Sequence, residues 1–321
     1  MSDNFFLGVD GGGTKTRFIL VDGDGKLAAA DEGPTSDHLQ VGIDGVRDVL
    51  AGGVAALFRE AGKDGSSIAY AFFGLPAYGE DSAAQVLLDG LPEPLLGHRR
   101  YRCGNDMICA WAGSLGGEDG INIVAGTGSI GYGERKGRSA RAGGWGEVFG
   151  DEGSAYWIAA QGLNIFTRMS DGRLPQGPLH ASLRRHLGLD ADLDLCAKLA
   201  DTSSRRAIAA MAELVARAAR ELAAIIEAVR QALEFEPGER VPISYSGGVF
   251  NAGELILSPL RHHIERYSKT YELKSPMLAP SLGAAIYAAR LAGQPFSPAA
   301  IERLRNGNRA RHRLPLRDES S

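Results

Sequence analysis

A glycine-rich turn directly after a buried-strand pattern is the first group of residues that could do chemistry. Three glycines let a backbone approach an anion and turn its N–H groups toward it, while threonine hydroxyls add donors. An aspartate at the strand end can hold Mg²⁺ through water. A type I′ hairpin turn explains the same residues equally well, and the GxxxxGK[ST] spacing of a Walker A loop is absent. The turn comprises Asp10, Gly11, Gly12, Gly13, Thr14, Lys15 and Thr16.

A second such turn follows another apolar run and comprises Gly126, Thr127, Gly128 and Ser129. In both copies an apolar strand meets a glycine turn with threonine and continues into a second strand. This weak internal repeat predicts two related α/β domains, each offering a turn to one cleft. Two turns together favour a grip on the β- and γ-phosphates of a nucleotide, with a coincidence of two hairpins as the alternative.

Asn105-Asp106 lies where a strand pattern gives way to a helix pattern. A carboxylate there can accept the proton of an attacking hydroxyl. Aspartate is also a favoured N-cap residue, and capping explains most aspartates in this position. Position alone therefore favours the cap.

Residues 143–153 form a third glycine-rich string that contains Trp145 and Asp151. Trp145 offers a flat apolar wall for a sugar, and Asp151 can accept hydrogen bonds from its hydroxyls. In the alternative reading, Trp145 is a core residue and Asp151 caps a helix over 154–162. Gly247 and Gly248 follow a further strand, where they suit either a purine lying against the backbone or a plain β-to-α turn.

Hydrophobic periodicity predicts the elements that position these residues. Short connections make the first three strands antiparallel neighbours. The clearest helix covers 207–235, and the stretch 303–321 reads as a frayed tail. The expected strands are 5–10, 16–22, 26–30, 68–74, 99–103, 121–125, 130–134 and 241–245, and the other helices are 42–61, 106–114, 154–162 and 281–291.

Composition limits the class of protein. A chain of 321 residues with 44% hydrophobic and 23% charged residues suits a globular protein of two domains. The net charge of -4 does not favour nucleic acid or an anionic membrane as partner. Cys103, Cys109 and Cys196 form no CxxC pair, and no run approaches the ~18 apolar residues of a membrane span. The first residues lead into a strand without a basic leader, so we expect a cytoplasmic protein.

In this order the motifs resemble the superfamily of actin, hexokinase and the heat-shock ATPases. Within it the chain resembles the family that joins N-acetylglucosamine kinases to the ATPases that activate benzoyl-CoA reductase and 2-hydroxyacyl-CoA dehydratase, most specifically in GGWGEVFGDEGSAYWIA from Gly143. The resemblance implies an α/β fold with two ribonuclease-H-like, actin/hexokinase-type domains around an ATP cleft. These would be residues 1–116 and 117–300, with 301–321 as a tail that packs back on the first domain or is frayed.

The resemblance also implies roles for single residues. ATP and Mg²⁺ are the expected cofactors, the two turns bind phosphates, Asp106 is the base, 246–249 meets the adenosine and 281–284 is a hinge. The family usually has Asn where Asp37 lies, and a carboxylate there would favour a free amine, so the sugar stays open. The expected sugar contacts are Asp37, His38, Asn105, Gly144, Trp145, Gly146 and Asp151.

The function implied is an ATP-dependent amino-sugar kinase that phosphorylates N-acetylglucosamine at the 6-hydroxyl, with glucosamine as the alternative substrate. A second class is an ATPase that activates a CoA-ester reductase or dehydratase and holds an iron–sulfur cluster through cysteines at a dimer interface. No cysteine lies in 126–153, and only a kinase uses Trp145 and Asp151. A sugar sensor without turnover is disfavoured by Asp106. The expected partner is a small sugar, and a homodimer is left open.

Overall fold

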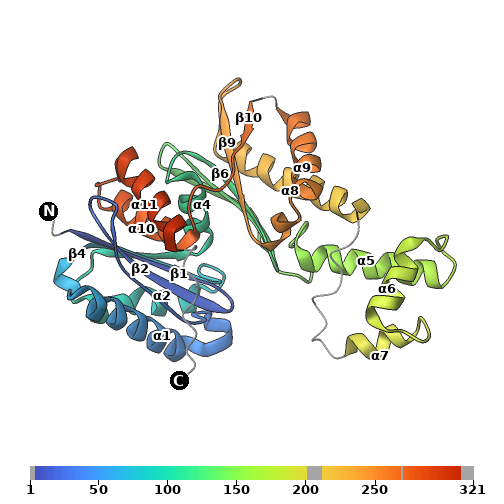
Figure 1. The fold of residues 1–321 in the computed structure, drawn as a ribbon, viewed down its shortest axis with the longest axis horizontal. Coiled ribbons are helices and arrows are strands. Elements are labelled where there is room, and N and C mark those ends of the chain that lie inside the picture. The colour runs from blue at the N-terminus through green and yellow to red at the C-terminus, as the bar shows by residue number, and fades with distance from the viewer. Residues whose placement is uncertain (1–3, 201–211, 269, 312–321) are drawn as a thin grey trace. The chain divides into compact units, whose positions relative to one another are not determined.

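The computed structural model of the protein describes residues 4–200, 212–268 and 270–311 (Figure 1). The chain forms two compact units. Unit 1 contains the described residues up to Asp119 and those from Ser275 onward, and unit 2 is Gly120–Lys274. No helix among the described residues is long and apolar enough to cross a membrane.

Unit 1 is built on a five-stranded sheet with the order β3-β2-β1-β4-β5. Its first three strands are antiparallel neighbours, as predicted, and β4 and β5 run parallel to β1. The elements are β1 Phe5–Gly11, β2 Lys15–Asp22, β3 Leu27–Pro34, α1 His38–Ala61, β4 Ile68–Leu75, α2 Ser82–Gly90, α3 Pro92–Leu96, β5 Tyr101–Asn105, α4 Met107–Leu115, α10 Pro280–Leu291 and α11 Pro298–Arg311.

The two faces of this sheet are covered by different helices. Along β1, successive side chains point to opposite faces. Leu7 and Val9 pack with Val46 and Leu50 of α1 on one face, and α10 packs on β1 from the other, together with α4. Asp10 alternates with Val9, so it belongs to the face on which α4 begins.

Unit 2 repeats this plan with the order β8-β7-β6-β9-β10. Its first three strands are again antiparallel, and β9 and β10 run parallel to β6, so the predicted internal repeat is confirmed. The elements are β6 Gly120–Ala125, β7 Ser129–Arg135, β8 Arg138–Gly143, α5 Ala155–Ser170, α6 Pro178–Leu187, α7 Asp194–Ala200, α8 Ala212–Ala232, β9 Val241–Ser246, α9 Glu254–Tyr267 and β10 Tyr271–Leu273.

Helix α8 covers one face of this second sheet. Leu222, Ile226 and Val229 lie one helical turn apart and are fully buried with Ile123 and Ile243 of the strands. The predicted helix is therefore present, although its first five residues, 207–211, lie outside the described residues. The pattern analysis did not predict α6, α7, α9, β8 or β10 of this unit, nor α2 and α3 of unit 1.

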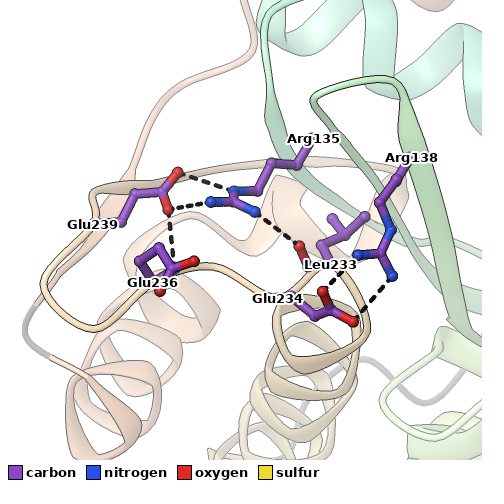
Figure 2. Close-up of polar contacts among 6 residues, drawn as sticks. All are labelled: Arg135, Arg138, Leu233, Glu234, Glu236 and Glu239. Carbon is purple, nitrogen blue, oxygen red and sulfur yellow. Dashed lines mark hydrogen bonds and ion pairs between the residues drawn. The ribbon is translucent and has the colours of Figure 1, made fainter.

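Two arginines fasten the β7–β8 hairpin to the segment that follows α8 (Figure 2). Buried Arg135 donates from Nη2 to Glu239 Oε2 at 2.6 Å, from Nε to Oε1 at 3.0 Å and from Nη1 to the Leu233 carbonyl at 3.3 Å. Exposed Arg138 pairs with Glu234 at 2.6 Å. The paired arginine holds the pKa of Glu239 down at about 2.

The C-terminal elements differ from the expected division of the chain. We expected residues 117–300 to form one domain, but α10 packs on β1, β4 and α4 of unit 1. The reason is that α10 is buried along most of its length, from Ser281 to Ala289, and fills the sheet face that α1 leaves open. The expected tail is helical to Arg311, and Leu304 is buried while Arg303 donates to the carbonyl of Asp24 in unit 1.

Candidate active site

Asp106 lies at the start of α4, but its side chain does not cap the helix. Its backbone is helical, with φ -62° and ψ -22°, and its carboxylate makes no capping hydrogen bond. The preceding residue caps instead, because Asn105 Oδ1 accepts from the Met107 amide at 3.1 Å. The interpretation of Asp106 as a helix cap is therefore wrong, and its carboxylate is left for another role.

The same hydrogen bonds define the position of Asn105. Its Nδ2 donates to the Tyr78 carbonyl at 3.2 Å, so the side chain also ties down the turn after β4. Asn105 was predicted to contact sugar, and in unit 1 both ends of its amide already serve the fold. Its sugar contact stays a prediction.

Asp10 and Asp106 are two carboxyls of unit 1 whose pKa values are raised. Burial raises the pKa of Asp10 to about 7, with the charge of Asp106 adding to it and that of Arg17 opposing it. Burial likewise raises the pKa of Asp106 to about 6, opposed by the amides of Met107 and Asp106 itself, while the charges of Glu80 and Asp37 add to it. A carboxyl with a pKa near neutrality is well matched to proton transfer at physiological pH.

Glu80 is a charge that the sequence analysis missed. It lies in the turn between β4 and α2, is exposed, and contributes to the raised pKa of Asp106. No periodicity or motif marks it, because its relation to Asp106 arises only when β4 and β5 pair side by side.

The first glycine turn is not a type I′ hairpin. That turn requires positive φ at both central residues, and neither Gly13 nor Thr14 has it. The Gly12 amide donates to the Lys15 carbonyl at 2.9 Å, and Gly13 and Thr14 are exposed. A Cβ on Gly11 would lie 2.4 Å from Ser36 Oγ, so this position admits only glycine.

The last two residues of the turn point away from its exposed tip. The Lys15 ammonium pairs with Glu32 of β3 at 2.9 Å, which together with Arg17 lowers the pKa of Glu32. Thr16 is fully buried and its hydroxyl has no hydrogen-bond partner among the described residues. The predicted phosphate contacts of Lys15 and Thr16 therefore stay predictions. Gly13 and Thr14 are exposed at the tip of the turn.

The predicted sugar segment lies beside this turn. Asp37 is the N-cap of α1, with Oδ1 accepting from the Leu39 amide at 3.0 Å and Oδ2 from Gln40 Nε2 at 2.7 Å. Helix α1 begins at His38 and breaks at Gly42, whose φ is 68°. Both ring nitrogens of His38 are buried and lack a partner in the part of the chain that the structure describes.

The second turn is held by the start of α5. The Ala155 amide donates to the Gly126 carbonyl at 2.8 Å, and Ser129 Oγ donates to the Glu152 carbonyl at 2.8 Å. A Cβ on Gly128 would lie 2.8 Å from Asp151 Oδ2, so the turn and Asp151 are in close contact. Unit 2 thus brings the predicted turn and this predicted sugar contact together.

The alternative readings of the third glycine string are wrong. Trp145 is 70% exposed in unit 2 and is not a core residue. Ser154, not Asp151, caps α5, since Ser154 Oγ accepts from the Trp157 amide at 3.1 Å. Burial raises the pKa of Asp151, opposed by the amides of Ser129 and Gly146. Gly144 and Gly146 both have positive φ in the loop that displays Trp145.

The segment after β9 lies against the second turn. Gly247 has φ 101°, and a Cβ there would lie 2.4 Å from the Ala125 carbonyl oxygen. A Cβ on Gly126 would lie 3.9 Å from the Gly248 amide. The backbone of residues 247–248 is therefore next to the turn, and its predicted contact with a nucleotide stays a prediction.

A duplicated α/β plan, with a glycine turn after the first strand of each copy, defines an ATPase fold of the actin and hexokinase type. Residues 7–288 match the BadF/BadG/BcrA/BcrD ATPase family, and the protein belongs to this family. The family resemblance and the fold class drawn from the motifs are confirmed.

Two relatives cover most of the chain. An N-acetyl-D-glucosamine kinase of Dictyostelium discoideum is 29% identical over 314 residues, which is 90% of this chain and 98% of the relative. An N-acetylmuramic acid/N-acetylglucosamine kinase of Clostridium acetobutylicum is 28% identical over 77% of this chain and 86% of its own length.

Solved structures agree with this fold. A protein of Chromobacterium violaceum, provisionally named an N-acetylglucosamine kinase, is 28% identical with a TM-score of 0.65, covering 90% of this chain and 98% of its own. A ROK family glucokinase of Streptomyces griseus, solved with glucose and AMPPNP, is 19% identical with a TM-score of 0.55, covering 89% and 99%. At that identity the likeness shows the fold alone.

Proposed function

We propose that the protein is an ATP-dependent kinase that phosphorylates the 6-hydroxyl of N-acetylglucosamine. The observation that carries the proposal is the carboxylate of Asp106, which is not used to cap α4 and whose pKa is raised to about 6. The names of two relatives that span most of this chain support the substrate class. Asp106 accepts the proton of the sugar hydroxyl as that oxygen attacks the γ-phosphorus of ATP.

Asp10 fits the expected role of a magnesium anchor. It lies in the strand that leads into the turn of the exposed residues Gly13 and Thr14, and no side chain among the described residues donates a hydrogen bond to its carboxylate. Mg²⁺ is typically held by one or two carboxylates, waters and the substrate phosphates, and it neutralises charge on those phosphates. Bound Mg²⁺ would keep Asp10 ionised despite its burial. Use of ATP as phosphoryl donor supports a cytoplasmic location as part of this proposal.

Asp37 is the residue that tests the choice of sugar. An ionised carboxylate has about four acceptor sites, and helix capping and Gln40 use two of them. Asp37 can therefore still accept from a sugar hydroxyl, as N-acetylglucosamine requires, or pair with the ammonium of glucosamine. Asparagine is an equally good N-cap, so Asp37→Asn changes the charge while keeping the start of α1.

The experiment compares kcat/KM for N-acetylglucosamine, glucosamine and glucose, by ADP release with ATP and Mg²⁺. We expect N-acetylglucosamine to be preferred by the wild type and by Asp37→Asn. A preference for glucosamine of tenfold or more, reversed by Asp37→Asn, would make glucosamine the substrate. Negligible turnover of both amino sugars would contradict the proposal.

The alternative of an electron-transfer activator is weakened by the positions of the cysteines. Cys103 and Cys109 are buried in unit 1 and donate to the carbonyls of Leu88 and Val9. Burial raises the pKa of both thiols, which disfavours the thiolates that an iron–sulfur cluster needs. Only Cys196 is exposed among these three.

A further inference from the structure

Two side chains after β3 hold the first glycine turn by its carbonyl groups. Thr35 Oγ1 donates to the Gly12 carbonyl oxygen at 2.8 Å. Gln40 Nε2 donates to the Gly13 carbonyl oxygen at 3.1 Å and to Asp37 Oδ2 at 2.7 Å. Thr35 lies in the segment of Asp37 and His38 but was given no role there, and Gln40 belongs to none of the motifs.

These bonds decide where the amides of the turn point. In a trans peptide the C=O and the N–H of the same unit point in opposite directions. Holding the carbonyls of Gly12 and Gly13 toward residues 35–40 therefore turns the N–H groups of Gly13 and Thr14 the other way. The Gly12 N–H is used inside the turn, whereas the N–H groups of Gly13 and Thr14 donate to nothing in the described residues.

The same bonds join the turn to the sugar segment. Gln40 bridges Gly13 and Asp37 with one amide nitrogen, so a shift of either end moves its donor away from the other. The Gln40 side chain is exposed. Among the described residues, a Cβ built on Gly13 would meet only Gln40 Nε2 within 4 Å, at 3.8 Å. Its contribution is thus a polar bridge rather than core packing.

We propose that Thr35 and Gln40 are positioning residues. They present the amides of Gly13 and Thr14 to the phosphates of ATP and couple this turn to the segment at Asp37, so that nucleotide and sugar each raise the affinity of the other. Such a coupling is reciprocal by thermodynamic necessity. The sugar half rests on the proposed function, whereas the nucleotide half does not.

The first measurement is the affinity of a non-hydrolysable ATP analogue with Mg²⁺, by calorimetry on the full chain. Thr35→Val removes the hydroxyl with little change of shape, and Gln40→Ala removes the bridge. We expect each to weaken binding roughly three- to tenfold, the effect of losing its one hydrogen bond to the turn. Each variant also loses one bond at Asp37, since Thr35 Oγ1 accepts from the Asp37 amide and Gln40 donates to Asp37 Oδ2. Asp48→Ala, at an exposed position of the same helix, should bind as the wild type does.

Gln40→Glu separates positioning from space filling. Glutamate has the shape of glutamine but would set a carboxylate against the Gly13 carbonyl and the Asp37 carboxylate. Positioning predicts that Gln40→Glu binds the analogue at least as weakly as Gln40→Ala. Near wild-type binding by Gln40→Glu with a loss in Gln40→Ala, or unchanged binding in all variants with an unchanged melting temperature, overturns the proposal.

The second measurement repeats the titration with saturating N-acetylglucosamine. We expect the sugar to tighten nucleotide binding in the wild type and to do so at most weakly in the double variant Thr35→Val, Gln40→Ala. Equal tightening in both overturns the coupling. If the wild type neither binds nor phosphorylates this sugar, the proposed function fails, while the nucleotide titration still decides whether Thr35 and Gln40 position the turn.

Discussion

The two glycine turns occupy the same place in two copies of one topology, yet they are held differently. In unit 1 the donors to the turn carbonyls are the side chains of Thr35 and Gln40. In unit 2 the donor to Gly126 is the backbone amide of Ala155 at the start of α5. A backbone donor survives most substitutions, whereas a side-chain donor is lost with one.

The charges at the two turns differ as well. β1 carries Asp10 just before its glycines, whereas β6 ends in Ala125. Unit 1 therefore places two carboxyls of raised pKa, Asp10 and Asp106, close together, while the strong ion pair of unit 2, Arg135 with Glu239, fastens a hairpin (Figure 2). The repeated fold supplies the scaffold, and side chains specific to unit 1 add the acid–base chemistry.

The largest expected effect is that of substituting Asp106 on the rate of phosphoryl transfer. Asp106→Asn should lower kcat by ~10²–10⁴-fold, because the amide cannot accept the proton of the attacking hydroxyl. The melting temperature should not fall, since Asn105 and not Asp106 caps α4. Steady-state kinetics and thermal unfolding test this, and a variant that keeps more than about a tenth of wild-type kcat would mean that Asp106 is not the base.

The next effect is on the free energy of unfolding when glycines at or beside the two turns are replaced. Gly11→Ala and Gly247→Ala should each destabilise the protein by about 1–3 kcal/mol, because the new Cβ would overlap Ser36 Oγ or the Ala125 carbonyl. Gly13→Ala is the matched control, since its Cβ would meet nothing closer than 3.8 Å. Denaturant unfolding measures all three, and an equal loss in Gly13→Ala would contradict the steric explanation.

A comparable or smaller effect is expected at the hairpin of unit 2. Glu239→Gln should cost roughly 1–3 kcal/mol, because the buried Arg135 loses its charged partner. Glu234→Gln, which disturbs the exposed pair with Arg138, should change the unfolding free energy little. Because the pKa of Glu239 is lowered from 4.5 to about 2, its contribution should be present above pH 4.5 and lost as the pH falls toward 2.

The last effect concerns Asp10 and has the opposite dependence on pH. The pKa of Asp10 is raised from 3.8 to about 7, so the folded state binds more protons than the unfolded state between these values and stability falls as pH rises through this range. Asp10→Asn removes the cost of burying the charge. The variant should melt at a higher temperature than the wild type at pH 8 and at the same temperature at pH 4, without nucleotide or Mg²⁺.

A lower melting temperature of Asp10→Asn at pH 8 would show that the carboxylate stabilises the metal-free protein. The catalytic counterpart is a fall of wild-type kcat below about pH 6, where Asp106 becomes protonated. The two titrations separate the stability role of one carboxylate from the catalytic role of the other.

Periodicity and glycine spacing were enough to predict the strands that carry both turns and the internal repeat, and the resemblance of the motifs gave the family. These features are local, because a strand of alternating burial and a glycine turn are encoded within about ten residues. Asp10, Asp106 and the two turns were singled out for the same reason: each follows the end of a strand. The division of the chain was not predictable in this way, since α10 is buried on most sides and its pattern suits either unit.

The amino-acid sequence by itself thus determined that two similar α/β units form and that each offers a glycine turn. Only the tertiary structure decided which polar residues are left for chemistry. Asp106 and Asn105 both suit a capping role, and only the packed strand end shows that the Asn105 side chain accepts from the Met107 amide. The links from Thr35 and Gln40 to Gly12 and Gly13 join residues more than 20 positions apart, and hydrogen bonds between distant residues depend on how strands pair, which local pattern does not encode.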